Sequence, residues 1–448
     1  MGADVASFDS SVPVLIFKIG RYPLSHGILG AIRSFGRVGV PVHAVSEDRL
    51  VPYAFSRFLS GHIVLPTTGE ESTDVLLSEL SRMAERLGRP SLLIPTDDES
   101  AIFVAEQQAS LRSSFILPAI EPGLPRALAS KRTLSLLCGR HGVDMPTTHF
   151  AKSVEDVLAF AEGARFPIVV KNSEPWIRIT VPAVRSTTIV ESPSALASLV
   201  RTWTSNPQVI LQEYIPRARA EDWIFHGYFD RNSGPLVAFT GLKQRSWPPH
   251  AGATAAGVAL PNAELANRAT DFCRKLGYRG IVDMDWRLDL RDGRYKLVDF
   301  NPRLGANFRL FVNKAGIDVV RAQHLDLTGR GVPTSTQISG RTLIVENLDL
   351  ASRLIGGAGH AIPMPRVARQ TELAWFAWDD PLPFFAMALR FSARVVSRMV
   401  ALLLGRGSRP AVRGRRVSPF ELPAADSRSD ERPVNRASSE IGPADESH

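Results

Sequence analysis

The sequence predicts an α/β protein: a doubly wound N-terminal domain, two α+β lobes, a C-terminal amphipathic helix and a disordered tail. Apolar runs alternate with helically periodic stretches between residues 14 and 119, the pattern of a parallel sheet with crossover helices. Turn residues between apolar runs at 223–245 and 281–300 predict antiparallel hairpins. After Gly405 the chain is rich in Arg, Pro, Ser, Asp and Glu, which indicates disorder over 406–448.

The N-terminal domain is placed at residues 1–122. Its glycines do not have the GxGxxG spacing of a dinucleotide site. Asp97, Asp98 and Glu99 follow a strand at the sheet edge where open α/β domains bind ligands, although Asp98 could equally cap the next helix. The expected strands are 14–19, 40–46, 62–66, 91–95 and 115–119, and the expected helices are 24–36, 73–87 and one starting near 99.

The two lobes are placed at 123–216 and 217–350. Lys171 ends an apolar strand, so its ammonium group meets an anion or extends to solvent. The first lobe is expected to contain helices at 126–142, with Lys131 near the start, 153–162 and 193–204, and strands at 166–173, 187–192 and 207–216. The second is expected to contain strands at 223–230, 235–245, 281–290, 295–300 and a final one at 340–347, with helices at 262–276, 307–312 and 319–327.

The hairpin at 281–300 carries a group of oxygen-bearing side chains. These are Asp283, Asp285, Asp299 and Asn301. Residues two apart on a strand share a face, and buried carboxylates are costly unless they are paired or coordinate a metal. Because Mg²⁺ prefers oxygen ligands, the sequence predicts a magnesium site, the alternative being a solvated hairpin. Arg303 stands where it could neutralise an anion beside the metal.

The composition of the chain indicates which kinds of partner it binds and in which cellular compartment it is found. The net charge is +8 and the pI is about 9.8, but the arginines are spread along the chain without a nucleic-acid-binding motif, so we expect no nucleic acid. A phosphate-bearing small substrate or an anionic membrane surface accounts for the charge. Cys138 and Cys273 fit neither a metal site nor a disulfide framework, and the N-terminus lacks signal-peptide character. We expect a cytoplasmic protein, with a peripheral location at the inner membrane face as the alternative.

A C-terminal extension, placed at 351–405, contains the predicted amphipathic helix over 382–404. Arg390, Arg394 and Arg398 recur every four residues and so line one face of it. Each arginine costs roughly 2.5 to 3.5 kcal/mol at the centre of a bilayer, which argues against a spanning helix. The alternatives are a peripheral membrane contact and packing on the body of the protein or on a second subunit in a homodimer.

Lys131, Lys171, the QEYI segment at 212–215 and the DFNPR segment at 299–303, in this order, resemble the ATP-grasp superfamily. The resemblance covers about residues 12–350. It implies that ATP lies between the two lobes, with Mg²⁺ or Mn²⁺ on one side and two lysines on the other. On this basis Lys131 and Lys171 contact the α- and β-phosphates.

The same resemblance assigns the nucleoside and metal contacts. Glu213, Tyr214 and Ile215 would meet the adenine edge through the backbone, and Glu221 would bind the ribose hydroxyls. The family's E-x-N magnesium pair corresponds to Asp299 and Asn301, with Asp in place of Glu. The earlier acidic ligand corresponds to Asp285, with Asp283, two residues upstream, as the competitor.

Two cationic assignments and one departure complete the comparison with the family. Arg303 is similar to the arginine that steadies the transferred phosphate, and Lys243 and Arg245 fall where substrate-side or γ-phosphate cations lie. The glycine-rich loop that often covers the phosphates is replaced by KNSEPWIRITVPAVRS, which contains no glycine. Arg178 or Arg185 from this segment could take its place.

The implied reaction is carboxylate activation by a carboxylate–amine ligase of the D-aspartate ligase or amino-acid ligase kind. A small-molecule carboxylate attacks the γ-phosphate to form an acyl phosphate, and an amine then displaces phosphate to give an amide. Catalysis would depend on positioning and on cations rather than on a protein nucleophile, so His26, His43 and His250 are expected to be structural. Bicarbonate chemistry is less favoured because there is no biotin carrier segment or second ATP-grasp copy. The alternative function is a non-catalytic nucleotide-binding protein, membrane-associated through the C-terminal helix.

Overall fold

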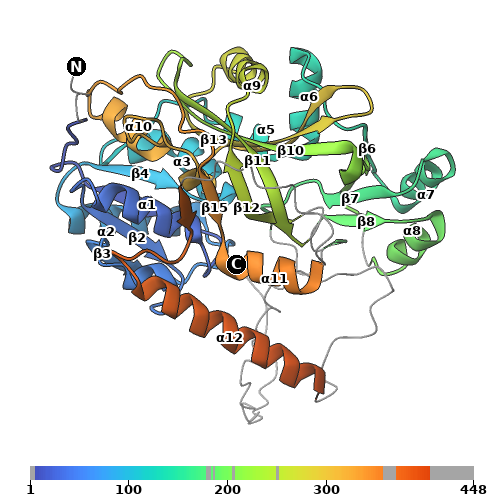
Figure 1. Ribbon diagram of the computed structural model, residues 1–448, viewed down its shortest axis with the longest axis horizontal. Coiled ribbons are helices and arrows are strands. Elements are labelled where there is room, and N and C mark those ends of the chain that lie inside the picture. The colour runs from blue at the N-terminus through green and yellow to red at the C-terminus, as the bar shows by residue number, and fades with distance from the viewer. Residues whose placement is uncertain are drawn as a thin grey trace, which may run out of the picture. The chain divides into compact units, whose positions relative to one another are not determined.

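The computed structural model describes residues 6–177, 183–184, 187–203, 207–248, 252–356 and 370–403. These residues form three β-sheets with helices packed against them (Figure 1). Arg178, Arg185, His250 and the predicted tail at 406–448 lie outside the described residues. The domain boundaries given above remain predictions.

The first sheet is parallel throughout, with the strand order β3-β2-β1-β4-β5, as predicted for a doubly wound domain. Asp97 caps α3 by accepting a hydrogen bond from the Ser100 backbone, so the cap proposed for Asp98 belongs to its neighbour. The strands are β1 (Val14–Phe17), β2 (Val42–Ser46), β3 (Gly61–Val64), β4 (Ser91–Pro95) and β5 (Phe115–Ile116). The helices are α1 (His26–Gly36), the 3₁₀ turn η1 (Pro52–Phe55), α2 (Thr73–Leu87), α3 (Asp98–Glu106) and α4 (Gln108–Leu111).

The second sheet is antiparallel, with the order β6-β9-β7-β8. The helix expected over 126–142 is in fact two helices, because Ser130 is extended and its hydroxyl caps the second helix through the Thr133 N–H. Lys131 is therefore the first residue of a new helix. The elements are α5 (Leu124–Ala129), α6 (Lys131–His141), β6 (Thr148–Phe150), α7 (Val154–Gly163), β7 (Ile168–Asn172), β8 (Thr188–Val190), α8 (Pro193–Val200) and β9 (Val209–Glu213).

The third sheet has seven strands in the order β14-β13-β10-β11-β12-β15-β16. Its strands are β10 (Ala220–Phe229), β11 (Pro235–Trp247), β12 (Ala253–Ala259), β13 (Gly280–Asp289), β14 (Arg294–Asn301), β15 (Thr342–Ile344) and β16 (Thr371–Leu373). Its helices are η2 (Arg217–Arg219), α9 (Ala263–Lys275), η3 (Phe308–Leu310), α10 (Val319–Leu327) and α11 (Glu346–Gly356). Both predicted hairpins are present.

Two expectations for this region were wrong, and one strand was not predicted. The sequence of β12, ATAAGVA, is made of short side chains that gave no strand signal, yet it is paired on both sides. The strand at 340–347 is not the last, because α11 and the parallel neighbour β16 follow β15. The helix expected at 307–312 is a single 3₁₀ turn, η3.

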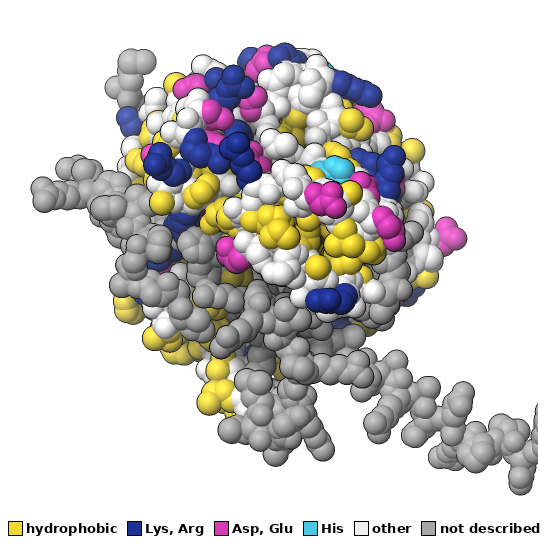
Figure 2. Space-filling model, turned by 90° about the vertical axis from the view of Figure 1, so that its right-hand side faces the viewer, with side chains coloured by type: hydrophobic (Ala, Val, Ile, Leu, Met, Phe, Trp, Pro, Cys, Tyr) yellow, Lys and Arg dark blue, Asp and Glu magenta, His cyan; other side chains and the backbone are white. Residues whose placement is uncertain are grey.

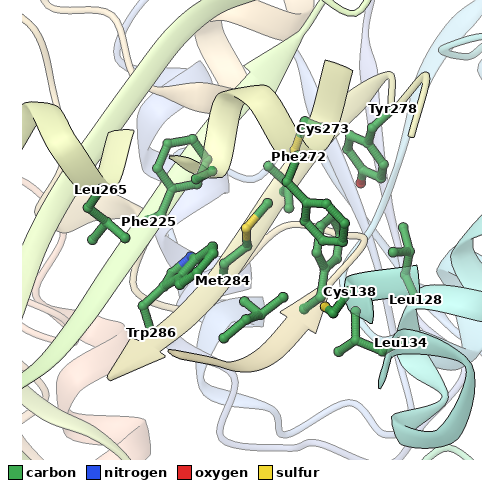
Figure 3. Close-up of a cluster of buried hydrophobic side chains, with 14 of the residues drawn as sticks. Leu128, Leu134, Cys138, Phe225, Leu265, Phe272, Cys273, Tyr278, Met284 and Trp286 are labelled. Atoms are coloured by element: carbon green, nitrogen blue, oxygen red, sulfur yellow. The ribbon is translucent and has the colours of Figure 1, made fainter. Parts of the chain in front are cut away.

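The acidic hairpin rests on a hydrophobic core. Val282, Met284 and Trp286 of β13 point into it, and α9 covers it with residues such as Phe272 (Figure 3). Side chains from α5 and α6, among them Leu128, close the other side. Because strand residues alternate, packing of the even-numbered positions sends the odd-numbered positions of β13 to the opposite face.

The last helix of the described chain is α12 (Leu382–Leu403), which packs against η1 and is drawn below α1 and β2 in Figure 1. Arg390 binds Asp48 through two hydrogen bonds of 2.9 and 2.6 Å, so this side chain is directed toward the N-terminal domain. Among the described residues, no helix is long and apolar enough to cross a membrane.

Candidate functional site

A cavity of about 130 Å³ lies between the second and third sheets. One wall comes from β7 and β9 and the residues that follow β9, and the other from β11, β13 and β14. Most of the predicted site residues line it: Lys171, Glu213, Tyr214, Ile215, Lys243, Asp285 and Asp299. The tertiary structure thus brings together residues that are up to 128 positions apart, from 171 to 299.

The register of the acidic hairpin groups four polar side chains on one face. Asp283 pairs with Asn301 and Asp285 pairs with Asp299 across the two strands. An irregularity after Asp285 shifts the register, so that Trp286 pairs with Leu297 rather than with Val298. The four oxygen-bearing residues therefore form a compact group that spans both strands.

Cationic side chains neutralise this group. The Lys131 ammonium contacts Asp299, and Lys243 Nζ lies 3.0 Å from Asp285 Oδ1. Arg303 donates from Nη2 to Asn301 Oδ1 at 3.0 Å and from Nε to Asp98 Oδ1 at 2.9 Å, which ties the hairpin to the N-terminal sheet. Asp98, at the ligand-binding edge of that sheet, is thus part of the same polar network.

The pKa values reflect burial and this crowding of charges. Burial, with the charge of Lys131 added, lowers the pKa of Lys171 to about 8. Burial raises the pKa of Asp285; Lys243 acts to lower that pKa, and the carboxylates of Asp283 and Asp299 act to raise it. Burial also acts to raise the pKa of Asp299, but Lys131 and Lys171 outweigh it and hold that pKa low. Lysine ammonium groups and aspartate carboxylates thus face the same cavity.

Asp283 has a different environment from Asp285. Its Oδ1 lies 3.1 Å from Nε2 of the fully buried His226, and it is not among the residues that line the cavity. A Cβ atom added to Gly305 would lie 2.4 Å from Asp283 Oδ2, so the backbone covers this carboxylate. Asp285, with 36% of its side chain exposed, is the accessible one of the two.

The donor chemistry fits a hard divalent cation. Among the described residues, no three His, Cys, Asp or Glu side chains are grouped closely enough to hold a metal by themselves. Asp285, Asp299 and Asn301 offer two carboxylates and an amide oxygen. This partial set fits Mg²⁺, which usually retains waters and takes substrate phosphates as its remaining ligands.

Two predicted residues lie elsewhere. Glu221 accepts a hydrogen bond from Trp223 Nε1 at 2.9 Å and does not line the cavity. The next residue, Asp222, does line it and binds Arg287 Nε at 2.7 Å. Arg245 pairs with Asp349 of α11 at 2.5 Å, away from the cavity, whereas Lys243 faces the cavity.

The sequence did not indicate Asp222 as a site residue. Its position opposite Arg287 follows from the pairing of β10 with β13 once the register of these two strands is known.

The remaining predicted residues belong to the wall formed by β7, β9 and the residues that follow β9. Glu213 ends β9, and its carboxylate contacts Arg291 while its backbone N–H donates to Thr147 at 2.8 Å. The Ile215 carbonyl accepts a hydrogen bond from Arg287 Nη1 at 3.2 Å. The Lys171 ammonium donates to Gln212 Oε1 at 3.2 Å, which holds it at the cavity wall.

Solved structures of proteins with the ATP-grasp fold resemble this arrangement of sheets. The chain matches N5-carboxyaminoimidazole synthetase from Staphylococcus aureus with a TM-score of 0.53 at 12% identity, over 74% of this chain and 82% of the other. It matches an L-amino acid ligase from Bacillus licheniformis with a TM-score of 0.52 at 15% identity, over 70% and 74%. It also matches, with a TM-score of 0.51 at 15% identity over 72% and 71%, the biotin carboxylase domain of Hydrogenobacter thermophilus 2-oxoglutarate carboxylase, solved with MgADP and bicarbonate.

Sequence comparison finds a ligase among the similar proteins. A D-aspartate ligase from Enterococcus faecium (strain Aus0004) is 24% identical over 313 residues, which cover 66% of this chain and 72% of the relative. No protein-family model matches the chain. The resemblance to ATP-grasp carboxylate–amine ligases that the sequence indicated is thereby confirmed.

Proposed function

We propose that this protein is an ATP-dependent ligase that activates a small, amino-acid-like carboxylate and couples it to an amine, releasing ADP and phosphate. The observation that carries the proposal is the cavity in which Lys171 and Lys243 face the carboxylates of Asp285 and Asp299. Phosphoryl transfer needs mainly positioning and electrostatic stabilisation, and this arrangement supplies both.

Different residues would bind the phosphates, the nucleoside and the metal ion. Lys131 and Lys171 would hold the α- and β-phosphates, and the backbone of 213–215 would hold the adenine edge. For the ribose we retain Glu221 as predicted and add Asp222, because Asp222 lines the cavity. Asp285, Asp299 and Asn301 would hold Mg²⁺, or Mn²⁺ in its place, which when bound neutralises phosphate charge.

Chemistry would take place beside Arg303 and Lys243. A carboxylate oxygen attacks the γ-phosphorus, and the bond from that phosphorus to the ADP oxygen breaks. The amine nitrogen then attacks the acyl carbon, the carbon–oxygen bond to phosphate breaks, and the nitrogen loses a proton. Arg303 would stabilise charge on the transferred group, and its hydrogen bonds to Asp98 and Asn301 support this role because they hold the guanidinium in position.

Phosphate release tests the proposal. The full-length protein is incubated with ATP and Mg²⁺ and with pairs drawn from amino acids, hydroxy acids and amines, D-aspartate included, and products are identified by mass. We expect phosphate release that requires both a carboxylate and an amine. An Asp271→Asn variant, which neutralises an exposed carboxylate on α9, should retain full activity and serves as the control.

A measurement of ATP binding distinguishes the ligase from a non-catalytic nucleotide-binding protein. If ATP binds, as judged by calorimetry, but no pair across a broad panel supports turnover, the protein is a nucleotide-binding protein of the same fold. The absence of glycine between Lys171 and Thr187 is the feature that would then explain the lack of catalysis.

A further inference from the structure

The segment that follows Lys171 is fixed at its start by backbone hydrogen bonds. It leaves the lobe of β7, α7 and α8, which faces the viewer in Figure 2. The backbone N–H of Ser173 donates to the Gln208 carbonyl at 2.8 Å, and the Ser173 carbonyl accepts from the backbone N–H of Lys131 at 3.0 Å. The two lysines that the proposed function assigns to the phosphates are therefore connected through Ser173, two residues after Lys171.

The same segment carries a tryptophan that meets two other helices. Trp176 is buried, with 8% of its surface accessible, and packs in a cluster with Ile102 of α3 and Ala129 of α5. In a cluster of this size the large aromatic ring supplies most of the contact area. Pro175, directly before it, has a fixed φ angle that stiffens the chain. The segment is thereby attached to the N-terminal domain as well as to α5.

This attachment lies directly beside the start of α6. Ala129 ends α5 and Lys131 is the first residue of α6. Trp176 therefore packs beside the helix start from which Lys131 extends, and Ser173 binds the Lys131 backbone. The Lys131 ammonium contacts Asp299, which lines the cavity. Because a lysine side chain is long and flexible, a backbone held at this position limits where the ammonium group can reach.

We infer that Trp176 is a positioning residue for nucleotide binding: it holds segment 173–176 against α5 and thereby fixes Lys131 for the phosphates. The inference rests on the proposed function, in which Lys131 binds phosphate. Trp176 is not among the described residues that line the cavity, so it acts through Lys131 rather than by contact with ATP. The absence of glycine from this segment agrees with an anchored chain, since glycine would add conformational freedom there.

Calorimetry in the presence of Mg²⁺ tests the inference with two ligands, ADP and adenosine. Trp176→Ala should weaken ADP binding about tenfold, the loss expected for one contact to a charged group. It should leave adenosine binding unchanged, because adenosine has no phosphate. Trp176→Phe, which keeps an aromatic ring against Ile102, should bind ADP within about threefold of the wild type. Equal weakening of both ligands by Trp176→Ala would overturn the inference, because it would indicate a general effect on the fold.

A second variant removes the other side of the same contact. Ile102→Ala changes the N-terminal domain and should reproduce the selective loss of ADP binding. Trp378→Ala, which removes a tryptophan that is 90% exposed, is one control. Val104→Ala is the other, because Val104 is a buried residue of the same helix that packs in a different cluster. Both controls should bind ADP as the wild type does, and urea denaturation establishes that each variant is folded.

A double variant shows whether Trp176 acts through Lys131. Lys131→Met removes the ammonium group, so the addition of Trp176→Ala should weaken ADP binding no further. Additive losses, or wild-type ADP affinity in Trp176→Ala, would overturn this inference and leave the proposed ligase function standing. Failure of the wild-type protein to bind ADP would instead contradict the proposed function, and this inference with it.

Discussion

Neutralising Asp285 and Asp283 in turn separates a metal-binding role from a structural one. Both carboxylates lie on β13 two residues apart, but Asp285 faces the cavity and Asp283 faces the buried His226. Asparagine keeps the shape of aspartate and removes its charge. The two variants should therefore show opposite effects on activity and on stability.

For Asp285→Asn we expect a large loss of turnover with little loss of stability. The Asp285–Lys243 pair is partly exposed, so its stabilising effect is of the order of 0.2 to 1 kcal/mol. Relief of repulsion from Asp283 and Asp299, which together with burial raises the pKa of Asp285, offsets part of this. The free energy of unfolding should stay within about 1 kcal/mol of wild type. Turnover should fall about 100-fold or more, the usual effect of removing one preorganised electrostatic group.

For Asp283→Asn we expect the reverse. Burial acts to raise the pKa of Asp283, but His226, Arg303 and Lys243 together outweigh burial, and the pKa is lowered. A carboxylate whose pKa is lowered by folding stabilises the protein at neutral pH, and this stabilisation is lost as pH falls through the lowered pKa. Loss of the charge opposite a fully buried His226 should cost about 1 to 3 kcal/mol at pH 7, with a smaller difference from wild type in acid.

Urea denaturation and phosphate release measure the two effects. The reasoning is refuted if Asp283→Asn loses turnover at unchanged stability while Asp285→Asn remains active. That result would assign the metal to Asp283. Equal losses of turnover in two stable variants would mean that both carboxylates serve the site.

Three further predictions concern the same region. ATP affinity measured by calorimetry should fall as pH rises above about 8, because the Lys171 ammonium loses its proton there. Lys171→Met should remove this pH dependence. An ATP affinity of the wild type that does not change with pH would contradict the role of Lys171. Gly305→Ala should lower the free energy of unfolding, measured in urea, by about 1 to 3 kcal/mol, because the added Cβ would overlap Asp283. Wild-type stability of this variant would show that the backbone at Gly305 can shift to make room for the Cβ. Asp222→Asn should weaken nucleotide binding more than Glu221→Gln does; the opposite order would support the original ribose assignment.

Local sequence patterns determined much of the secondary structure and the chemical character of the site. Helix α2 spans Thr73–Leu87 as predicted, because its apolar spacing and the Ser72 cap are local signals. The hairpin of β13 and β14 is predictable for the same reason, since alternation and a Gly-containing turn are local signals. The grouping of its four oxygen-bearing residues also needs the irregularity after Asp285, which shifts the pairing of β14 by one residue and is not evident from the sequence.

Long-range contacts decided the rest. That Asp222 rather than Glu221 lines the cavity, and that Arg245 pairs with Asp349 beyond it, depends on which strands are neighbours. Strand β12 exists because partners on both sides supply its hydrogen bonds, not because its small residues favour a strand.

Helix α12 shows most plainly the difference between what local sequence and what long-range contacts determine. The sequence by itself determined a helix with arginines along one side and apolar residues along the other. Only the tertiary structure decided which side faces inward, because Asp48, 342 positions away, binds Arg390. Periodicity fixes the relation of one face to the other, but the direction a face points depends on a partner that is remote in the sequence.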